Sequence, residues 1–207
     1  MGSAYAATYD PWNRLVKLEA GSTTVAKYEY NGLGQRIEEI ADRDGDGTLD
    51  EEHNIYYSRR WQRLLVGKGD AAENEYKKYI WGTRYVDDLV QFNQDPNTES
   101  GFAHTSYVLQ DANFRVTARV NDDTSTILER YHYTPYGARE VLDADWTADA
   151  DGQSDNDMQI GHQGLWHHPQ TGLIYNRHRI LHANLGRFLQ RDTLGYVDGG
   201  NLYTYLS

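Results

Sequence analysis

The residues best suited to chemistry are three aspartates at alternate positions, Asp42, Asp44 and Asp46, followed by Gly47. Carboxylates at every second position of a loop converge their oxygens on one point, and the glycine permits the sharp turn that this needs. The pattern fits the first part of an EF-type calcium loop and predicts a structural Ca2+ site. The further predicted ligands are the backbone carbonyl of Thr48, Asp50 acting through a water molecule, and Glu52.

The same loop departs from a complete calcium loop near its end. His53 stands where such a loop has its bidentate glutamate, and Glu52 lies one residue too early. The flanking segments are typical of strands and not of the helix pair of an EF-hand. The alternative is a solvated acidic hairpin tip, and we expect any affinity for calcium to be weaker than that of a complete loop.

A group of histidines near the C-terminal end is the second feature with chemical potential. It lacks the His-Glu-x-x-His spacing of a metal site, so roles at the surface or in packing against aromatic rings are favoured over metal binding. Aromatic side chains could also bind carbohydrate by stacking, but packing within the sheet is the favoured role for most of the tryptophans. Trp166 is the first to probe among the four candidates, Trp61, Trp81, Trp146 and Trp166. The histidines are His162, His167, His168, His178 and His182.

Composition excludes several function classes. The 207-residue chain carries a net charge of −11, so the basic patch that nucleic-acid binding needs is not expected. It has no cysteine, which rules out disulfides and thiol nucleophiles. No apolar run approaches the ~18 residues of a membrane span, so we expect no membrane insertion. The 17 tyrosines and 5 tryptophans favour a folded, sheet-rich chain over a disordered acidic one.

The elements that must position these groups are strands. Apolar and polar residues alternate in segments such as Val25–Tyr30, and Asn31-Gly32 predicts a two-residue hairpin turn directly after it. Tyrosines recur at loosely regular intervals, as expected for a repeated hairpin with variable turns. These tyrosines are Tyr9, Tyr30, Tyr57, Tyr79, Tyr107 and Tyr133. We therefore predict an all-β fold in which consecutive strands pair as an antiparallel meander.

Two groups of motifs resemble the RHS/YD-repeat family and its RHS repeat-associated core. The segments Tyr9-Asp10-x-x-Asn13-Arg14-Leu15 and Tyr30–Arg36 are similar to YD repeats, and Tyr133-Thr134-Pro135-Tyr136-Gly137 is similar to the segment that precedes the core. The stretches Thr171–Arg179, Leu185–Asp192 and Asn201–Tyr205 are similar to the core itself. The resemblance is stronger over about 1–40 and 130–207 than between them.

The resemblance implies a curled antiparallel β-sheet of YD-repeat hairpins, as a partial shell or barrel-like wall. We expect a repeat sheet over 1–140 with the acidic insertion at 42–53, an acidic linker loop over 141–157, and an inward-tucked core over 158–207. The implied role is structural: the shell encloses or displays a C-terminal polymorphic toxin or effector domain of the parent chain, secreted or at the cell surface. An open sheet edge further predicts either self-association through edges or a loop that covers the edge.

Some members of the family cut their own chain by an aspartyl-type mechanism, and the resemblance maps that role onto Arg191 and Asp192. Such chemistry needs two neighbouring carboxylates, and an arginine beside them can orient one or lower its pKa. Thr193 stands where the family has proline. The alternative is a turn stabilised by an ion pair, so an autoprotease and a calcium-dependent adhesion module remain the competing functions.

Overall fold

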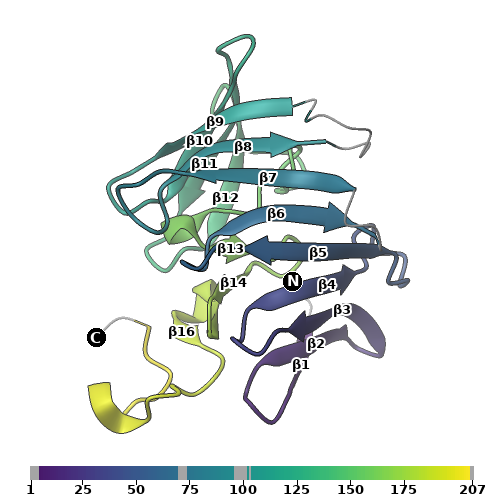
Figure 1. The fold of residues 1–207 in the computed structure, drawn as a ribbon, viewed down its shortest axis with the longest axis vertical. Helices are drawn as coiled ribbons and strands as arrows, with labels where there is room; N and C mark the ends of the chain where they lie inside the picture. The colour runs from purple at the N-terminus through teal and green to yellow at the C-terminus, as the bar shows by residue number, and fades with distance from the viewer. Residues whose placement is uncertain (1–4, 70–73, 96–101, 103, 206–207) are drawn as a thin grey trace. The chain divides into compact units, whose positions relative to one another are not determined.

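The computed structural model describes residues 5–69, 74–95, 102 and 104–205. Its first twelve strands hydrogen-bond in their order along the chain, with antiparallel pairing, and four short strands form a second sheet (Figure 1). The all-β prediction is confirmed. Within the described residues, no helix has the length and apolar character needed to cross a membrane.

The elements have the following bounds. Strands β1 to β12 are Tyr5–Tyr9, Leu15–Ala20, Thr23–Tyr30, Arg36–Ala41, Glu51–Tyr57, Arg63–Lys68, Glu75–Trp81, Leu89–Gln94, His104–Gln110, Val116–Asn121, Ile127–Tyr133 and Arg139–Asp143. Strands β13 to β16 are Trp166–His167, Leu173–Asn176, Arg179–His182 and Arg187–Phe188. Three 3-10 turns lie at His162–Gly164, Ala183–Leu185 and Tyr196–Asp198.

The chain divides into two compact units. The first holds β1 to β6, the first four residues of β7 and Asp95. The second holds the end of β7, β8 and the strands from β9 onward. In the first unit, Leu15, Leu18 and Ala26 are buried, as expected for one face of a sheet. Charged residues share that burial: Arg36 and Glu39 are each 1% exposed, and the Arg36 guanidinium lies 3.8 Å from the centre of the Tyr28 ring. Charged side chains therefore contribute to the buried face of this sheet alongside Leu, Ala and Tyr.

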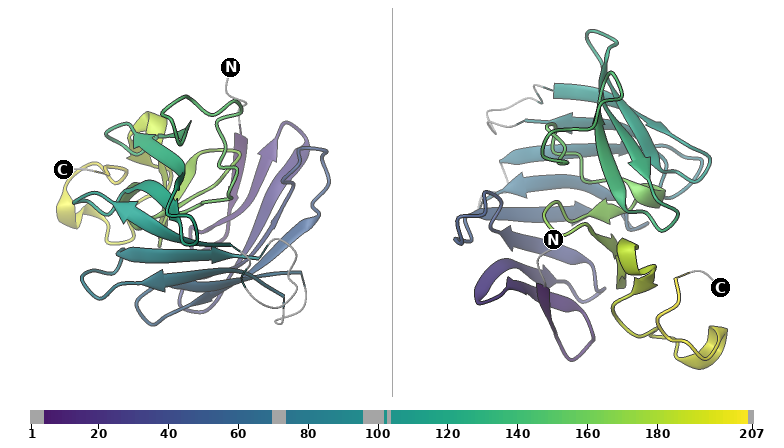
Figure 2. Two further views of the ribbon diagram at one scale, coloured as in Figure 1. Left: turned by 90° about the horizontal axis from the view of Figure 1, so that it is seen from above. Right: turned by 180° about the vertical axis from the view of Figure 1, so that it is seen from behind.

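In the second unit, the C-terminal segment packs against strands of the large sheet (Figure 2). Val116 of β10 donates its backbone N–H to the carbonyl of Gly161, and the Tyr133 ring of β11 contacts the ring of His162. The core of the small sheet is built from Leu165, Ile174, Leu181, Ala183 and Phe188, all buried. The core segment thus folds back onto the sheet, as the resemblance implies.

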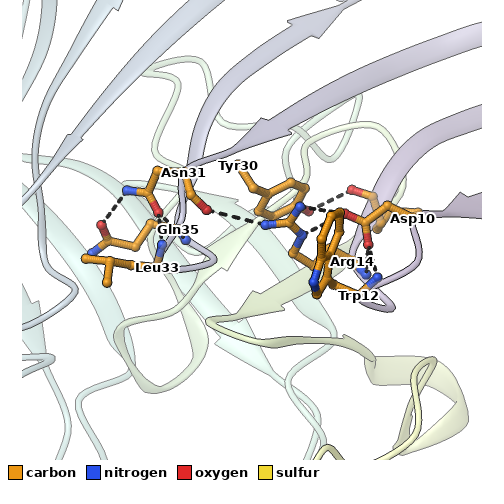
Figure 3. A network of polar contacts seen from close by, with 8 residues as sticks. Asp10, Trp12, Arg14, Tyr30, Asn31, Leu33 and Gln35 are labelled. Atoms are coloured by element: carbon orange, nitrogen blue, oxygen red, sulfur yellow. Dashed lines mark hydrogen bonds and ion pairs between the residues drawn. The ribbon is translucent and has the colours of Figure 1, made fainter.

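Most hairpins at one end of the strands use one turn geometry, seen first at Asp10–Arg14 (Figure 3). The backbone N–H of Asp10 donates to the carbonyl of Arg14, and Asn13, at φ 63°, donates back to the carbonyl of Asp10. The Asp10 carboxylate accepts from the backbone N–H of Trp12 at 3.0 Å and of Arg14 at 2.9 Å. We call this five-residue arrangement the capped turn, since the first side chain caps the backbone of the third and fifth residues.

The capped turn recurs with different residues. At Asn31–Gln35 the Asn31 amide oxygen accepts from Leu33 and Gln35, each at 3.0 Å, and Gly34 takes φ 79° (Figure 3). The predicted two-residue turn at Asn31-Gly32 is wrong, because Asn31 uses its side chain as the cap and Gly34 is the residue with positive φ. The same backbone hydrogen bonds occur at Ser58–Gln62, Asp111–Arg115, Thr134–Ala138 and Asp143–Thr147.

The last capped turn covers the outer edge of β12. After it the chain runs back along the strand: Asp143 donates its backbone N–H to the carbonyl of Thr147, and Asp149 donates to the carbonyl of Val141. Leu142 and Ala148 form an antiparallel bridge between these two bonds. Of the two predicted outcomes for a sheet edge, the structure shows a covering loop at β12.

Candidate functional site

The acidic loop between β4 and β5 brings Asp42, Asp44 and Asp46 together. One carboxylate oxygen from each lies within 4.8 Å of the others. The loop is folded by its own aspartates: Asp42, buried, accepts from the backbone N–H of Gly45 at 2.7 Å and of Gly47 at 2.9 Å. Both glycines have positive φ, of 80° and 93°, which a residue with a Cβ rarely adopts. The arrangement can offer three carboxylates to one cation.

The other predicted calcium ligands lie less favourably. Thr48 donates its backbone N–H to the Asp46 carboxylate at 2.7 Å, which keeps it beside the cluster. Asp50 is exposed, and Glu52 lies in β5 with its carboxylate accepting from the Asn54 amide at 3.2 Å. The structure therefore brings together three of the four predicted aspartates and leaves Glu52 in the sheet.

The two residues predicted for autoproteolysis have separate partners. The Asp192 carboxylate lies 2.8 Å from the guanidinium of Arg179 and accepts from the backbone N–H of Leu194, also at 2.8 Å. Arg191 is exposed, and its Nε donates to the Tyr203 hydroxyl at 3.3 Å. Asp192 also donates its backbone N–H to the carbonyl of Leu202. Asp192 therefore lies in a turn that is held by hydrogen bonds and by an ion pair with Arg179, a partner that the sequence motif did not indicate.

The histidines fill an aromatic core. His162 and His167 are buried, and their ring centres lie 6.1 and 6.0 Å from that of Tyr133. His167 accepts from the backbone N–H of His162 at 2.9 Å. Burial lowers the pKa of His162 to about 4, and it also holds the pKa of His167 well below its usual value. Both rings are therefore neutral at pH 7. Aromatic packing is confirmed for His162, His167 and His168, whereas His178 is exposed.

Trp166 is buried and is no surface platform for a sugar. It is 4% exposed, its indole N–H donates to the Gln159 side chain at 3.0 Å, and its ring meets that of His168 edge-on. Packing, the favoured role for the tryptophans, is therefore confirmed for Trp166, and the alternative of carbohydrate stacking is wrong for this residue because its ring is buried in the second unit.

One polar network was not predicted at all. Glu129 of β11, 4% exposed, accepts from the backbone N–H of Asn156 at 2.9 Å, its side-chain amide at 2.7 Å and the Ser154 hydroxyl at 2.7 Å. The Tyr131 hydroxyl also donates to it. A signal was present, because Glu129 shares its inward phase in the strand with Tyr131 and Tyr133. The network fixes the acidic 143–157 segment to the sheet.

The three relatives compared with this chain are all named as toxins or toxin subunits. No protein-family model matches the chain. It is 38% identical to "Toxin protein Tse5" of Pseudomonas aeruginosa over 99% of its own length and 16% of that protein. It is 24% identical to "Double-stranded DNA deaminase toxin A" of Burkholderia cenocepacia, over 95% of this chain and 16% of the relative. "Toxin subunit YenC1" of Yersinia entomophaga is also 24% identical, over 85% of this chain and 18% of the relative.

Solved structures share the fold. The crystal structure of TcdB2-TccC3 matches 97% of this chain and 10% of that chain, with a TM-score of 0.67 and 19% identity. The form described as lacking the hypervariable C-terminal region matches with the same TM-score and identity, over 9% of that chain. The chain spans less than a fifth of each of these proteins. It is a homologue of one segment of large toxin proteins and has the β-sheet fold seen within a Tc toxin complex.

Proposed function

We propose that this chain is part of an RHS/YD-repeat shell, the part that carries the RHS-associated core, in a larger secreted toxin protein. In this proposal the divisions are the repeat sheet over 1–140, the acidic linker over 141–157 and the core over 158–207. The shell encloses or displays a C-terminal toxin or effector domain of the same parent chain at the cell exterior. The role of the chain itself is structural.

The observation that carries the proposal is the match along the whole chain to one segment of Tse5, at 38% identity and 16% of that protein. A self-contained protein would instead match its relatives from end to end. The recurrent capped turn supports the same view, since it is a repeating unit that further strands can extend. Strand β1, whose residues Tyr5 to Thr8 are exposed, offers the edge to which a preceding strand, or a second copy of an isolated chain, would pair.

The test uses the full-length product of the gene that encodes this chain. We expect limited proteolysis to cut the domain that follows the shell about tenfold more slowly in the parent than the same domain expressed alone, because the wall excludes the protease. Protection should vanish at the denaturant concentration that unfolds the shell. Equal cleavage rates in the two forms would contradict the proposal.

The same full-length protein separates the autoprotease from the scaffold. The full-length protein and its Asp192→Asn variant are each incubated without added protease. A cleaved band that is present in the parent and absent in Asp192→Asn would assign catalysis to Asp192, with Arg191 as its neighbour. If the full-length protein stays uncut, the autoprotease is excluded and the scaffold role is retained.

The clustered carboxylates favour a second, structural proposal, that Ca2+ binds between Asp42, Asp44 and Asp46 and orders the β4–β5 connection, with Thr48, Asp50 and Glu52 as further ligands. A calcium-dependent adhesion module would need such a site. Calcium at about 100 times its Kd should add about 2.7 kcal/mol to the free energy of unfolding. Melting curves with calcium and with a chelator should therefore differ for the unmodified chain and coincide for Asp44→Asn. Asp122→Asn is the control, because Asp122 is an exposed aspartate in the connection between β10 and β11, outside the acidic loop, and this variant should respond to calcium like the unmodified chain.

A further inference from the structure

A pocket of about 340 Å³ lies wholly within the second unit. Three separate segments line it: the connection between β7 and β8, the capped turn at Asp111–Arg115, and the C-terminal segment around β14. The lining residues that the argument uses are Tyr85, Asp87, Asn113, Phe114, Gln163 and Arg177. Its volume is in the range of small-molecule sites.

An aromatic pair forms one side of the pocket. The rings of Tyr85 and Phe114 stack with centres 4.8 Å apart and planes 20° apart. Tyr85 is 53% exposed, although it is a large aromatic side chain in an ordered stack. A stacked and exposed ring is a flat apolar surface with a polar hydroxyl at its end, which suits a ligand with one apolar face and polar edges.

The polar groups on the pocket carry no net charge. The Arg177 guanidinium lies 2.8 and 3.0 Å from the two oxygens of Asp87, so the cation and the anion neutralise each other. Gln163 accepts from the Tyr205 hydroxyl at 2.6 Å through its oxygen, and its amide nitrogen is a donor. Guanidinium, carboxylate and amide groups together provide donors and acceptors for hydroxyls, while their balanced charge offers little attraction to an ion.

The backbone around the pocket is held in an unfavourable conformation. Phe114, Gln163 and Arg177 have φ of 58°, 53° and 53°, a region that residues other than glycine rarely adopt. Gly164 packs so closely that a Cβ there would lie 2.5 Å from the Cβ of Asp87. The positive φ of Phe114 and of Arg177 belongs to the turns in which they lie, the capped turn at Asp111–Arg115 and the two-residue connection between β14 and β15, so the backbone fixes the shape of the pocket and does not by itself indicate a ligand.

We propose that this pocket binds a neutral saccharide, with one sugar face against the exposed Tyr85 ring and the hydroxyls hydrogen-bonded by the Asp87–Arg177 pair, Asn113 and Gln163. The proposal does not depend on the shell role, because it uses only groups within the second unit. It gives a display scaffold a means of holding a glycan at a surface.

The test is nuclear magnetic resonance titration of the whole chain with the methyl glycosides of glucose, galactose, mannose and N-acetylglucosamine, with sodium acetate as the ionic comparison. We expect at least one glycoside to shift the backbone signals of residues 112–114 and 163–165. Tyr85→Ala should weaken that binding about tenfold, which corresponds to the loss of one aromatic contact. Asn113→Ala should also weaken it while leaving the fold intact, because the turn is bonded through the backbone N–H of Asn113 and not through its side chain.

The control is Tyr107→Ala, which removes a tyrosine of similar exposure, 46%, in β9 and outside the pocket lining. It should leave the titration unchanged. Absence of any shift with all four glycosides overturns the proposal, as does equal binding by Tyr85→Ala. Acetate binding at the same signals in preference to the sugars would also overturn it, since the site would then be a carboxylate receptor centred on Arg177.

Discussion

Replacing Glu129 by glutamine should release the acidic 143–157 segment from the sheet. In the native chain its two carboxylate oxygens accept two N–H groups of Asn156 and the hydroxyls of Ser154 and Tyr131. Glutamine keeps the shape but has no charge, and its amide nitrogen must face two of the four donors. The hydroxyls can rotate to accept from that nitrogen, so the main loss is charge assistance.

The magnitude follows from the bond count and the burial. A hydrogen bond to a charged group contributes roughly 1 kcal/mol more than a neutral one, and four are affected at a side chain that is 4% exposed. We expect the free energy of unfolding to fall by about 4 kcal/mol, which lowers the Tm by roughly 8–16 °C for a chain of this size. Glu129→Ala, which leaves all four donors without an acceptor, should cost more.

Glu140→Gln provides the matched control. Glu140 lies on the neighbouring strand β12, and its carboxylate is 59% exposed with His132 at 3.5 Å, so its loss should change the free energy of unfolding by less than about 0.5 kcal/mol. Thermal and urea unfolding of both variants give the comparison. Hydrogen exchange adds a local measurement, since the backbone N–H of Asn156 should exchange faster in Glu129→Gln. Equal stabilities of the two variants, with unchanged exchange at Asn156, would refute the role given to this network.

Two further predictions concern packing and pH. Gly137→Ala should lower the free energy of unfolding by about 3 kcal/mol, because a Cβ there would lie 2.5 Å from the His162 ring and φ is 91°. Gly21→Ala is the comparison in the same unfolding assay: φ is 62° but no atom lies within 4 Å, so it should cost about 1 kcal/mol. The His53 ring, whose Nε2 lies 2.8 Å from the Glu51 carboxylate, lowers the pKa of Glu51 from 4.5 to about 2 against the effect of burial. A carboxyl whose pKa is lower in the folded state than in the unfolded state stabilises the fold at pH values above its unfolded pKa. The contribution of Glu51 is therefore present above about pH 4.5 and is lost as the pH falls toward 2. Glu51→Gln should flatten the stability profile in that window, and an unchanged profile would contradict the assignment.

The strand content and the tyrosine repeat could be predicted from alternation, but the phase of the repeat could not. Tyr9, Tyr30 and Tyr133 directly precede a capped turn, whereas Tyr79 and Tyr107 lie two and three residues before the ends of their strands. Register in a sheet is set by the pleat and by turn geometry, and a tyrosine is equally stable at several points of a strand. Tyrosine spacing alone therefore identifies hairpins without fixing where they turn.

Candidate sites were harder to predict because they depend on partners distant in sequence. The convergence of Asp42, Asp44 and Asp46 is local, and their spacing was enough to find it. The partner of Asp192 is Arg179, and that of Asp87 is Arg177, ninety residues along the chain. Nothing in a linear motif encodes these pairs: Arg179 and Asp192 meet when the small sheet forms, and Asp87 and Arg177 meet only when the small sheet folds back onto the large one.

The capped turn explains why the repeat is regular in structure and loose in sequence. Its first position needs only a side-chain oxygen that reaches two backbone N–H groups, so Asp10, Asn31 and Ser58 serve equally. Its fourth position needs positive φ, which glycine adopts freely, yet Trp61 and Phe114 occupy it as well. The turn therefore tolerates an aromatic residue where glycine would be the least strained choice. At the Asp111–Arg115 turn this residue is Phe114, whose ring stacks on Tyr85. Sequence variation at one position of a repeated turn therefore supplies an aromatic residue of the proposed saccharide pocket.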